Sequence, residues 1–204
     1  MNNTKLLPFN IKNLPFIVDV VEPLWSPPVG DAVYKRFNVE YIVRNNIAEN
    51  DYRFELVEEQ GQKEETINHL LAAAFFARKG DSSLVEEWFK ANSSRFSPEL
   101  LKASDMSRTY LTMMDNRTLS LMNDDDIKLS LFVSRQAGAG SEILQQTMQL
   151  LRKQGWKNLY LWTDIDCNWQ WYPKHGFTLV EEASYEPFSK EDEDYKTYIF
   201  KRKL

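Results

Sequence analysis

The stretch Lys128-Leu-Ser-Leu-Phe-Val-Ser-Arg-Gln-Ala-Gly-Ala-Gly-Ser141 decides how the rest of this chain of 204 residues is interpreted. Leu129, Leu131 and Val133 alternate with the residues between them, a period of two that predicts a strand with one strongly apolar face. Residues 142–153 then repeat apolar side chains at helical spacing. A strand that leads through a glycine-containing loop into a helix favours anion binding, because the loop N–H groups converge and the helix start adds about half a positive charge.

The glycine spacing narrows the kind of anion. Gly138-Ala-Gly140 lacks the third glycine of a dinucleotide-binding loop, and no Gly-Lys-Ser/Thr follows as in a triphosphate-binding loop. Neither a nicotinamide cofactor nor ATP is therefore favoured. From these residues alone, a strand, loop and helix that bind no phosphate stay equally open.

Two linked motifs carry a resemblance to a known family. Arg135-x-x-Gly138-x-Gly140 after a strand resembles the acetyl-CoA pyrophosphate loop of the GCN5-related N-acetyltransferase superfamily. A second predicted strand at 158–163 leads to Asn168-Trp-Gln-Trp-Tyr172-Pro-Lys-His-Gly176-Phe177, which resembles the superfamily's Asn…Phe-Tyr-x-x-x-Gly-Phe segment. The match covers about 128–182 closely and, in the order of elements, most of the chain more loosely.

The resemblance implies an α/β (α+β) fold with a mixed, largely antiparallel sheet and helices on both faces. In that fold strands four and five splay apart near a bulge, and the pantetheine arm of the cofactor lies between them. We expect residues 1–204 to form a single acetyltransferase-like domain with a helical insertion at 79–123, before the fourth strand. The insertion could cover the sheet, make a dimer contact, or form a lid over the acceptor site.

Local signals predict the remaining elements. Asn10 can cap a helix that Pro23 ends, and Asp31 can cap a second helix that buries Val33, Phe37 and Tyr41. Further strands are expected at 52–57, 67–77, 177–180 and 195–201, a turn near Gly61, and a helix start at Ser97-Pro98.

What the resemblance implies for chemistry is direct transfer of an acetyl group from acetyl-CoA to an amine acceptor. Tyr172 matches the tyrosine that faces the cofactor sulfur. A phenol with a pKa near 10 is protonated at neutral pH and can act as general acid to the departing thiolate. A purely structural aromatic is the alternative. Backbone groups near Phe132 and Val133 would pair with the pantetheine arm.

The same resemblance assigns the other cofactor contacts. The pyrophosphate would be held by the Arg135 side chain and by the backbone N–H groups of Gln136, Ala137, Gly138, Ala139, Gly140 and Ser141. The Ser141 hydroxyl either caps the helix or touches phosphate. Asn168 either binds the pantetheine arm or only satisfies the turn.

Other reactive side chains are weaker candidates. Cys167 is close enough to a thioester for an acyl-cysteine to be conceivable, although free cysteines are usually buried apolar residues. His175 ends a helix, where an imidazole is usually structural, and His69 begins a strand. The base that deprotonates the acceptor is open among the following carboxyl groups: Glu55, Glu58, Asp164 and Asp166.

Composition limits the partners. The net charge of −5 argues against nucleic acid, and no apolar run approaches the roughly 20 residues of a membrane span. A single cysteine excludes an intramolecular disulfide and a Cys-rich metal site, so we predict no metal. With no visible secretory signal, a cytoplasmic protein is expected.

The charges are also unevenly placed. Residues 127–160 carry five basic side chains and one acid, whereas 181–194 carry seven acids and one lysine. The basic stretch fits a polyanionic cofactor, and the acidic stretch is either a solvated loop or attracts a cationic acceptor. Two classes of function follow: an N-acetyltransferase for a small-molecule or peptide amine, or a non-catalytic CoA-binding or oligomerisation module. A panel of amines separates the two classes, and a homodimer is conceivable.

Overall fold

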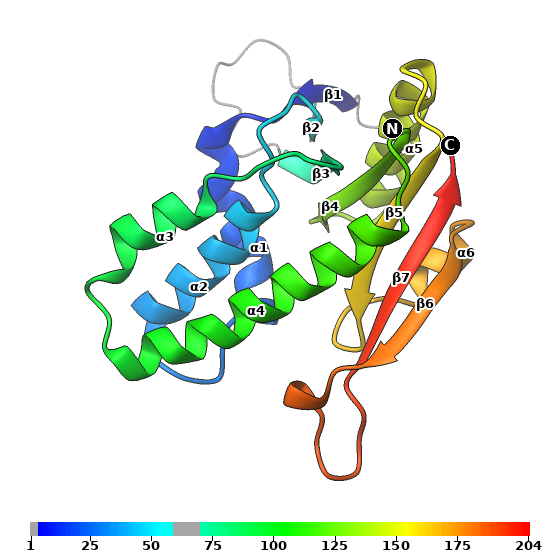
Figure 1. Cartoon of the computed structure of the whole chain (residues 1–204). Coiled ribbons are helices and arrows are strands. Elements are labelled where there is room, and N and C mark those ends of the chain that lie inside the picture. Colours follow the sequence, from blue (N-terminus) through cyan, green and yellow to red (C-terminus); the bar gives the residue numbers. More distant parts are fainter. Residues whose placement is uncertain (1–3, 59–69) are drawn as a thin grey trace.

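The computed structural model describes residues 4–58 and 70–204, and its described strands form one seven-stranded sheet in the order β1-β2-β3-β4-β5-β7-β6 (Figure 1). The only parallel neighbours among these strands are β4 and β5. This is the mixed, largely antiparallel sheet that was expected. The strands are β1 Thr4–Pro8, β2 Arg53–Glu58, β3 Leu70–Arg78, β4 Asp126–Ser134, β5 Asn158–Asp164, β6 Thr178–Ser184 and β7 Lys196–Lys203.

Helices cover both faces of the sheet (Figure 1). Apolar side chains of α5 pack on one face, and those of α1, α2 and α4 pack on the other. None of the helices in the described ranges is both long enough and apolar enough to cross a membrane. The helices are α1 Leu14–Trp25, α2 Ala32–Asn45, α3 Val85–Ser93, α4 Pro98–Leu121, α5 Ala139–Lys153 and α6 Trp171–Lys174, with short 3-10 turns η1 Ile11–Asn13 and η3 Glu186–Phe188.

Local capping explains where two of the helices begin. The Asp31 side chain accepts the Tyr34 N–H at 2.9 Å and starts α2 as predicted. The start of the first helix differs, because Asn10 caps η1 and α1 follows it. Its end differs too: Pro23 lies inside α1, which continues to Trp25 although proline has no N–H to donate to the carbonyl oxygen of Asp19. Val33 is 55% exposed, and Tyr34 is the buried residue in its place.

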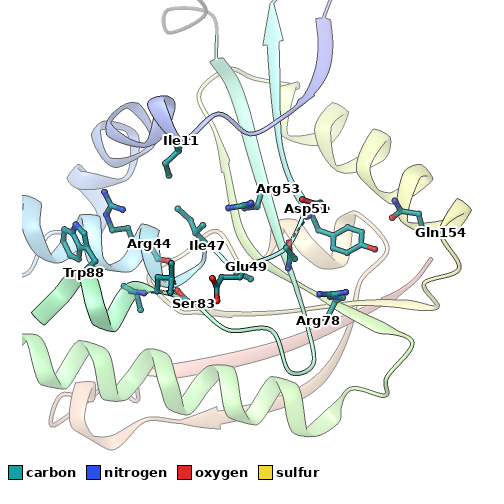
Figure 2. A pocket seen from close by; sticks show the side chains of 15 residues that line it. Ile11, Arg44, Ile47, Glu49, Asp51, Arg53, Arg78, Ser83, Trp88 and Gln154 are labelled. Carbon is teal, nitrogen blue, oxygen red and sulfur yellow. Dashed lines mark hydrogen bonds between the residues drawn. The ribbon is translucent and has the colours of Figure 1, made fainter. Parts of the chain in front are cut away.

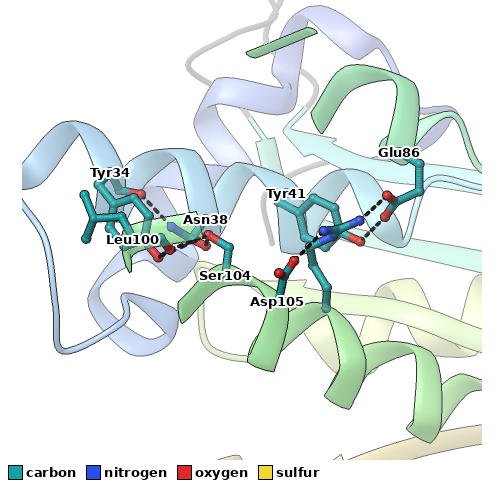
Figure 3. A network of polar contacts seen from close by, with 8 residues as sticks. Tyr34, Asn38, Tyr41, Glu86, Leu100, Ser104 and Asp105 are labelled. Atoms are coloured by element: carbon teal, nitrogen blue, oxygen red, sulfur yellow. Dashed lines mark hydrogen bonds and ion pairs between the residues drawn. The ribbon is translucent and has the colours of Figure 1, made fainter. Parts of the chain in front are cut away.

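The predicted insertion is helical and is tied to α2 by polar contacts (Figure 3). The Tyr34 hydroxyl donates to the Leu100 carbonyl oxygen at 2.6 Å, and the Ser104 hydroxyl donates to Asn38 Oδ1 at 2.8 Å. Farther along α4, Arg108 forms ion pairs with Glu86 of α3 and with Asp105. Helix α4 is therefore anchored both to α2, which precedes β2 and β3 in the chain, and to α3.

A bulge in β4 changes which way its side chains face. Phe75 of β3 is opposite Leu131 while the next residue, Phe76, is opposite Leu129, so Ser130 is an extra residue in β4. Leu129 consequently packs on the α5 face, whereas Leu131 packs against α1 and α2. The expected single apolar face for 129, 131 and 133 is therefore wrong.

The same bulge marks the point where β4 and β5 separate. The two strands pair only over 126–128 and 158–160, so the pairing stops two residues before the bulged residue, Ser130. We call the region beyond Lys128 and Tyr160, where these parallel strands are unpaired, the β4–β5 split. It lies at the carboxyl ends of both strands, next to the start of α5.

Candidate active site

The loop between β4 and α5 presents free backbone N–H groups. Ser134 Oγ donates to the Gln136 carbonyl oxygen at 2.9 Å, and the Ala139 N–H donates to the same oxygen at 3.1 Å, which closes the turn. Gly138 has a φ of +87°, in the left-handed region that favours glycine. Within the described chain no protein acceptor meets the remaining N–H groups, those of Gln136, Ala137, Gly138, Gly140 and Ser141.

The second glycine of the loop has a different reason to be there. A Cβ at Gly140 would lie 3.2 Å from Phe132 Cζ and 3.3 Å from Ser134 Cβ. A side chain at this position would require Phe132 and Ser134 to move by a few tenths of an ångström, so glycine suits the close start of α5 beside β4. Gly138 thus serves the turn and Gly140 the approach of helix to strand, and together they hold the free N–H groups at the helix start, where an anion is favoured.

The end of β4 supplies a charge and an open edge. The Arg135 N–H donates to the Leu71 carbonyl oxygen at 2.9 Å, and its guanidinium lies 4.6 Å from the centre of the Phe16 ring. No carboxylate pairs with it in the part of the chain that the structure describes. Since backbone groups alternate along a strand, those of Val133 point to β3 and those of Phe132 point into the β4–β5 split.

Tyr172 lies on the other side of the split, in α6. Its half-buried ring packs against Phe177 and Phe200, on the α5 face of the sheet. Burial raises the pKa of the Tyr172 phenol, and the neighbouring Cys167 and Asp164 raise it further. The phenol therefore keeps its proton at neutral pH.

Two other predicted residues near α6 have local roles. The backbone oxygen of Asn168 accepts the Trp171 N–H at 3.1 Å, which fits the turn, while its exposed side chain has no hydrogen-bond partner among the described residues. His175 stacks on the Trp171 ring at 3.5 Å, with Nδ1 2.7 Å from the Trp171 carbonyl oxygen. The histidine is thus held by its own helix.

Aromatic rings narrow the split on the α5 face. The rings of Phe132 and Trp171 have their centres 5.4 Å apart, although these residues belong to β4 and α6. A ligand that enters the split from this face must pass beside these two rings.

One of the four carboxyl groups that the sequence left open as the base, that of Asp164, ends β5. Asp164 is only 7% exposed, and its Oδ2 accepts the Tyr110 hydroxyl at 2.9 Å. Burial, followed by the charge of Asp164, raises the pKa of the Cys167 thiol to about 12. A thiol that stays protonated is a poor nucleophile, which argues against an acyl-cysteine. No local pattern in the sequence connects Tyr110 with Asp164, and folding alone brings the two side chains together.

The other carboxyl candidates are placed less suitably. Glu55 is buried in β2, and β3 separates it from β4; its Oε2 accepts the Asn13 side-chain amide at 2.8 Å and the Asn10 N–H at 3.3 Å. Asp166 is exposed, and Glu58 ends β2. His69 and the predicted turn near Gly61 lie outside the described residues.

A cavity of about 830 Å³ is found at the opposite end of the sheet (Figure 2). It includes Arg78 at the end of β3, opposite Ile127 at the start of β4, far along the strands from the loop at 135–140. Arg78 is ion-paired with Asp81 at 2.8 Å and Arg44 with Glu40 at 2.7 Å. Nothing in the sequence pointed to this cavity, and it is separate from the candidate active site.

Comparison with known proteins places this geometry in a fold family. No family model and no curated protein matches the sequence. Among solved structures, the chain is similar to the ribosomal-protein-S18-alanine N-acetyltransferase from Escherichia coli, with 13% identity, a TM-score of 0.54 and coverage of 99% and 94% of the two chains. It is also similar to mosquito arylalkylamine N-acetyltransferase like 5b, with 12% identity, a TM-score of 0.53 and coverage of 99% and 100%.

A further neighbour is the C-terminal condensation domain of Ebony in complex with β-alanyl-dopamine, with 9% identity, a TM-score of 0.58 and full coverage of both chains. The chain therefore has the fold of the GCN5-related N-acetyltransferases, as its two motifs predicted.

Proposed function

We propose that the protein is an acetyl-CoA-dependent N-acetyltransferase that moves an acetyl group directly to an amine. The observation that carries this proposal is the set of unpartnered N–H groups beside the open edge of β4, those of Gln136, Ala137, Gly138, Gly140 and Ser141. A thioester of CoA has both a pyrophosphate for such a loop and amides for such an edge. Bound acetyl-CoA would supply an activated acyl group.

The residues divide into three roles. The loop N–H groups and Arg135 bind pyrophosphate, with Ser141 at the helix start. The backbone of Phe132 pairs with the pantetheine amides, and Asn168 faces them from the turn before α6. Tyr172 gives its proton to the departing sulfur. The Ala139 N–H is already used within the turn, and Val133 is paired to β3, so these two shape the site.

The acceptor class is supported only as an amine. One neighbour is named for an alanine of a ribosomal protein and another for arylalkylamines. The condensation domain was solved in complex with β-alanyl-dopamine. A small molecule and a peptide both stay in play. Release of free CoA thiol across a panel of amines, with acetyl-CoA present, would identify the acceptor.

A matched pair of glycine variants tests the cofactor loop. Gly138 and Gly80 both have a φ of +87° and no atom within 4 Å of an added Cβ, so alanine at either position costs about 1 kcal/mol of stability for the same reason. Only Gly138→Ala should weaken acetyl-CoA binding, by about 10-fold or more, measured as a reduced thermal shift and by calorimetry. Equal affinities for the two variants would remove the loop from the site.

A tyrosine variant tests the general acid. Tyr172→Phe should lower kcat by about 100-fold with little change in acetyl-CoA affinity, because the lost proton donor acts on the leaving group. Tyr52→Phe, at the cavity end of the sheet, serves as the control. Unchanged turnover in Tyr172→Phe would exclude Tyr172 from the mechanism.

We also propose one alternative, a non-catalytic CoA-binding or oligomerisation module of the same fold. The contact between Phe132 and Trp171 favours it, because these rings narrow the split that a reacting thioester would occupy. A thermal shift with acetyl-CoA but no thiol release with any amine would support the module. If Phe132→Ala then gained turnover, the rings would be a barrier within an enzyme.

A further inference from the structure

The strongest unexplained group near the split is the Asp164 carboxyl group. It belongs to the last residue of β5, beyond the point where β5 leaves β4, and it faces α4 through its contact with Tyr110. Its Oδ1 is buried and accepts no hydrogen bond from residues 4–58 and 70–204, although the Tyr195 hydroxyl and the Cys167 thiol lie close enough to interact with the carboxyl group. Buried carboxyl oxygens are normally hydrogen-bonded, so an oxygen left without a partner at this place needs a reason.

The carboxyl group also lacks a cation. Under the same helix, Lys128 is ion-paired with Asp115, and Arg117 with Glu181. Arg117 contacts the hydroxyl of Thr197, the β7 residue opposite Asp164, at 3.1 Å, but its charge is already matched by Glu181. Across the described chain no basic side chain forms an ion pair with Asp164. A buried charge without a partner is unfavourable, and a cationic ligand would relieve it.

The surroundings of Asp164 supply neutral donors only. Burial raises the pKa of each neighbouring phenol and thiol, and the charge of Asp164 raises it further. At neutral pH these groups all stay protonated and uncharged, so none of them neutralises Asp164. The neighbours are Tyr110 in α4, Cys167 and Tyr172 in the segment after β5, and Tyr195, the residue before β7. Asp166 is exposed and adds negative charge near Tyr195.

Aromatic rings from two separate segments surround this place. The Tyr110 ring lies 4.9 Å from that of Tyr185, 5.0 Å from Phe188 and 5.7 Å from Trp162. Tyr110 comes from the insertion, whereas Tyr185 and Phe188 come from the β6–β7 connection. Asp164 thus sits at an apolar, aromatic wall on the α4 face, while Tyr172 packs on the α5 face.

We infer that Asp164 Oδ1 binds the ammonium group of the acceptor and takes its proton, and that α4 of the insertion and the β6–β7 connection wall the acceptor site. The inference rests on the proposed function. The acceptor class that fits is a primary alkylammonium carried on an aromatic or apolar group. The insertion would then be part of the active site and would do more than cover the sheet.

The proton and bond changes balance. One ammonium proton passes to Asp164 and on to solvent, and the neutral amine nitrogen forms a bond to the thioester carbonyl carbon. The carbon–sulfur bond breaks, and the sulfur takes the proton of Tyr172. The second amine proton leaves the nitrogen and restores the phenol through solvent, so the products are an N-acetyl amide, a free thiol and one released proton.

The first experiment compares two neighbouring aspartates. Wild-type protein is screened with acetyl-CoA and phenethylamine-type amines; failure of both acetyl-CoA binding and turnover would refute the proposed function itself. With an active amine in hand, Asp164→Asn should lower kcat/KM for that amine by about 100-fold or more and leave the acetyl-CoA Kd within twofold of wild type. Asp166→Asn, two residues on and exposed, should leave both values within twofold.

A second readout needs no turnover. Calorimetry of the same amine without acetyl-CoA should show binding to wild type and at least 10-fold weaker binding to Asp164→Asn. The alcohol of the same shape, which carries no charge, should bind both proteins equally. Equal amine affinity for wild type and Asp164→Asn, or turnover of the variant within threefold of wild type, would overturn the inference.

Tyr110→Phe keeps the inference testable if Asp164→Asn does not fold. This variant retains the ring and removes only the hydroxyl that donates to Asp164 Oδ2. As a positioning residue, Tyr110 should change kcat/KM for the amine about 3-fold to 10-fold, with amine binding weakened to a similar degree and acetyl-CoA affinity unchanged. An unchanged amine affinity and rate in this variant would contradict the role given to α4.

Discussion

Helix α4 borders two polar regions of the molecule that differ in how well their groups are matched. At its first half, Ser104 and Arg108 meet α2 and α3, where the buried acceptors receive donors and each charge has an opposite charge (Figure 3). The Arg108 Nε–H is the one buried donor there that has no partner in the described chain, but its guanidinium charge is still paired. At its second half, Tyr110 meets Asp164, which keeps one buried oxygen without a donor and has no cation in the described chain. The first arrangement is what a fold needs, and the second is what a binding site for a cation needs.

The largest expected effect comes from leaving a buried acceptor near Ser104 without its donor, the condition that Asp164 Oδ1 already has. Ser104 is buried, and its hydroxyl donates to Asn38 Oδ1 at 2.8 Å. Ser104→Ala would leave that amide oxygen buried without a donor and should lower the free energy of unfolding by about 1–3 kcal/mol. Urea denaturation measures this change.

Ser107→Ala is the matched control, because Ser107 lies on the same helix, is less buried and has no side-chain hydrogen bond within the described ranges. It should change stability by less than about 0.5 kcal/mol. If Ser104→Ala behaved like the control, the matched network would not hold the insertion to α2. Turnover per folded molecule should stay at the wild-type level in both variants.

A smaller effect, and of opposite sign, is expected in the unmatched region. Asp164→Asn removes an unpaired buried charge, and the amide oxygen can still accept the Tyr110 hydroxyl. In the absence of ligands, its free energy of unfolding should equal or exceed that of wild type by up to about 1 kcal/mol. A loss as large as that of Ser104→Ala would mean that Asp164 serves the fold.

The sequence predicted what depends on neighbours along the chain. Asp31 caps α2, and the glycine-containing loop after β4 leads into α5, because each needs only the residues beside it. Two features of the site depend on distant partners. The bulge at Ser130 appears only in the register with Phe75 and Phe76, and it reversed the predicted facing of Leu131.

The contact between Tyr110 and Asp164 shows the same limit. It joins residues 54 positions apart, in helix α4 and at the end of strand β5, which no local pattern connects. Asp164 was one of several carboxyl groups that the sequence left open. Only its burial, its unpartnered oxygen and the strand separation beside it distinguish it from Glu55, whose Oε2 is held by two N–H donors.

The smallest expected effect reports directly on the charge of Asp164. Cys167 is the single cysteine of the chain, and its thiol pKa is raised to about 12, first by burial and then by Asp164. A nearby negative charge disfavours the thiolate, so Asp164→Asn should lower this pKa while burial keeps it above the ordinary value of a free thiol.

Below the pKa, the rate of alkylation by iodoacetamide follows the thiolate fraction, which rises about 10-fold for each pH unit. The profile of alkylation rate against pH should therefore move to lower pH in Asp164→Asn, giving a several-fold faster rate at pH 9, and should stay in place in Asp166→Asn. Superimposable profiles for wild type and Asp164→Asn would show that Asp164 carries no charge next to the thiol, and the contrast between the two ends of α4 would lose its electrostatic basis.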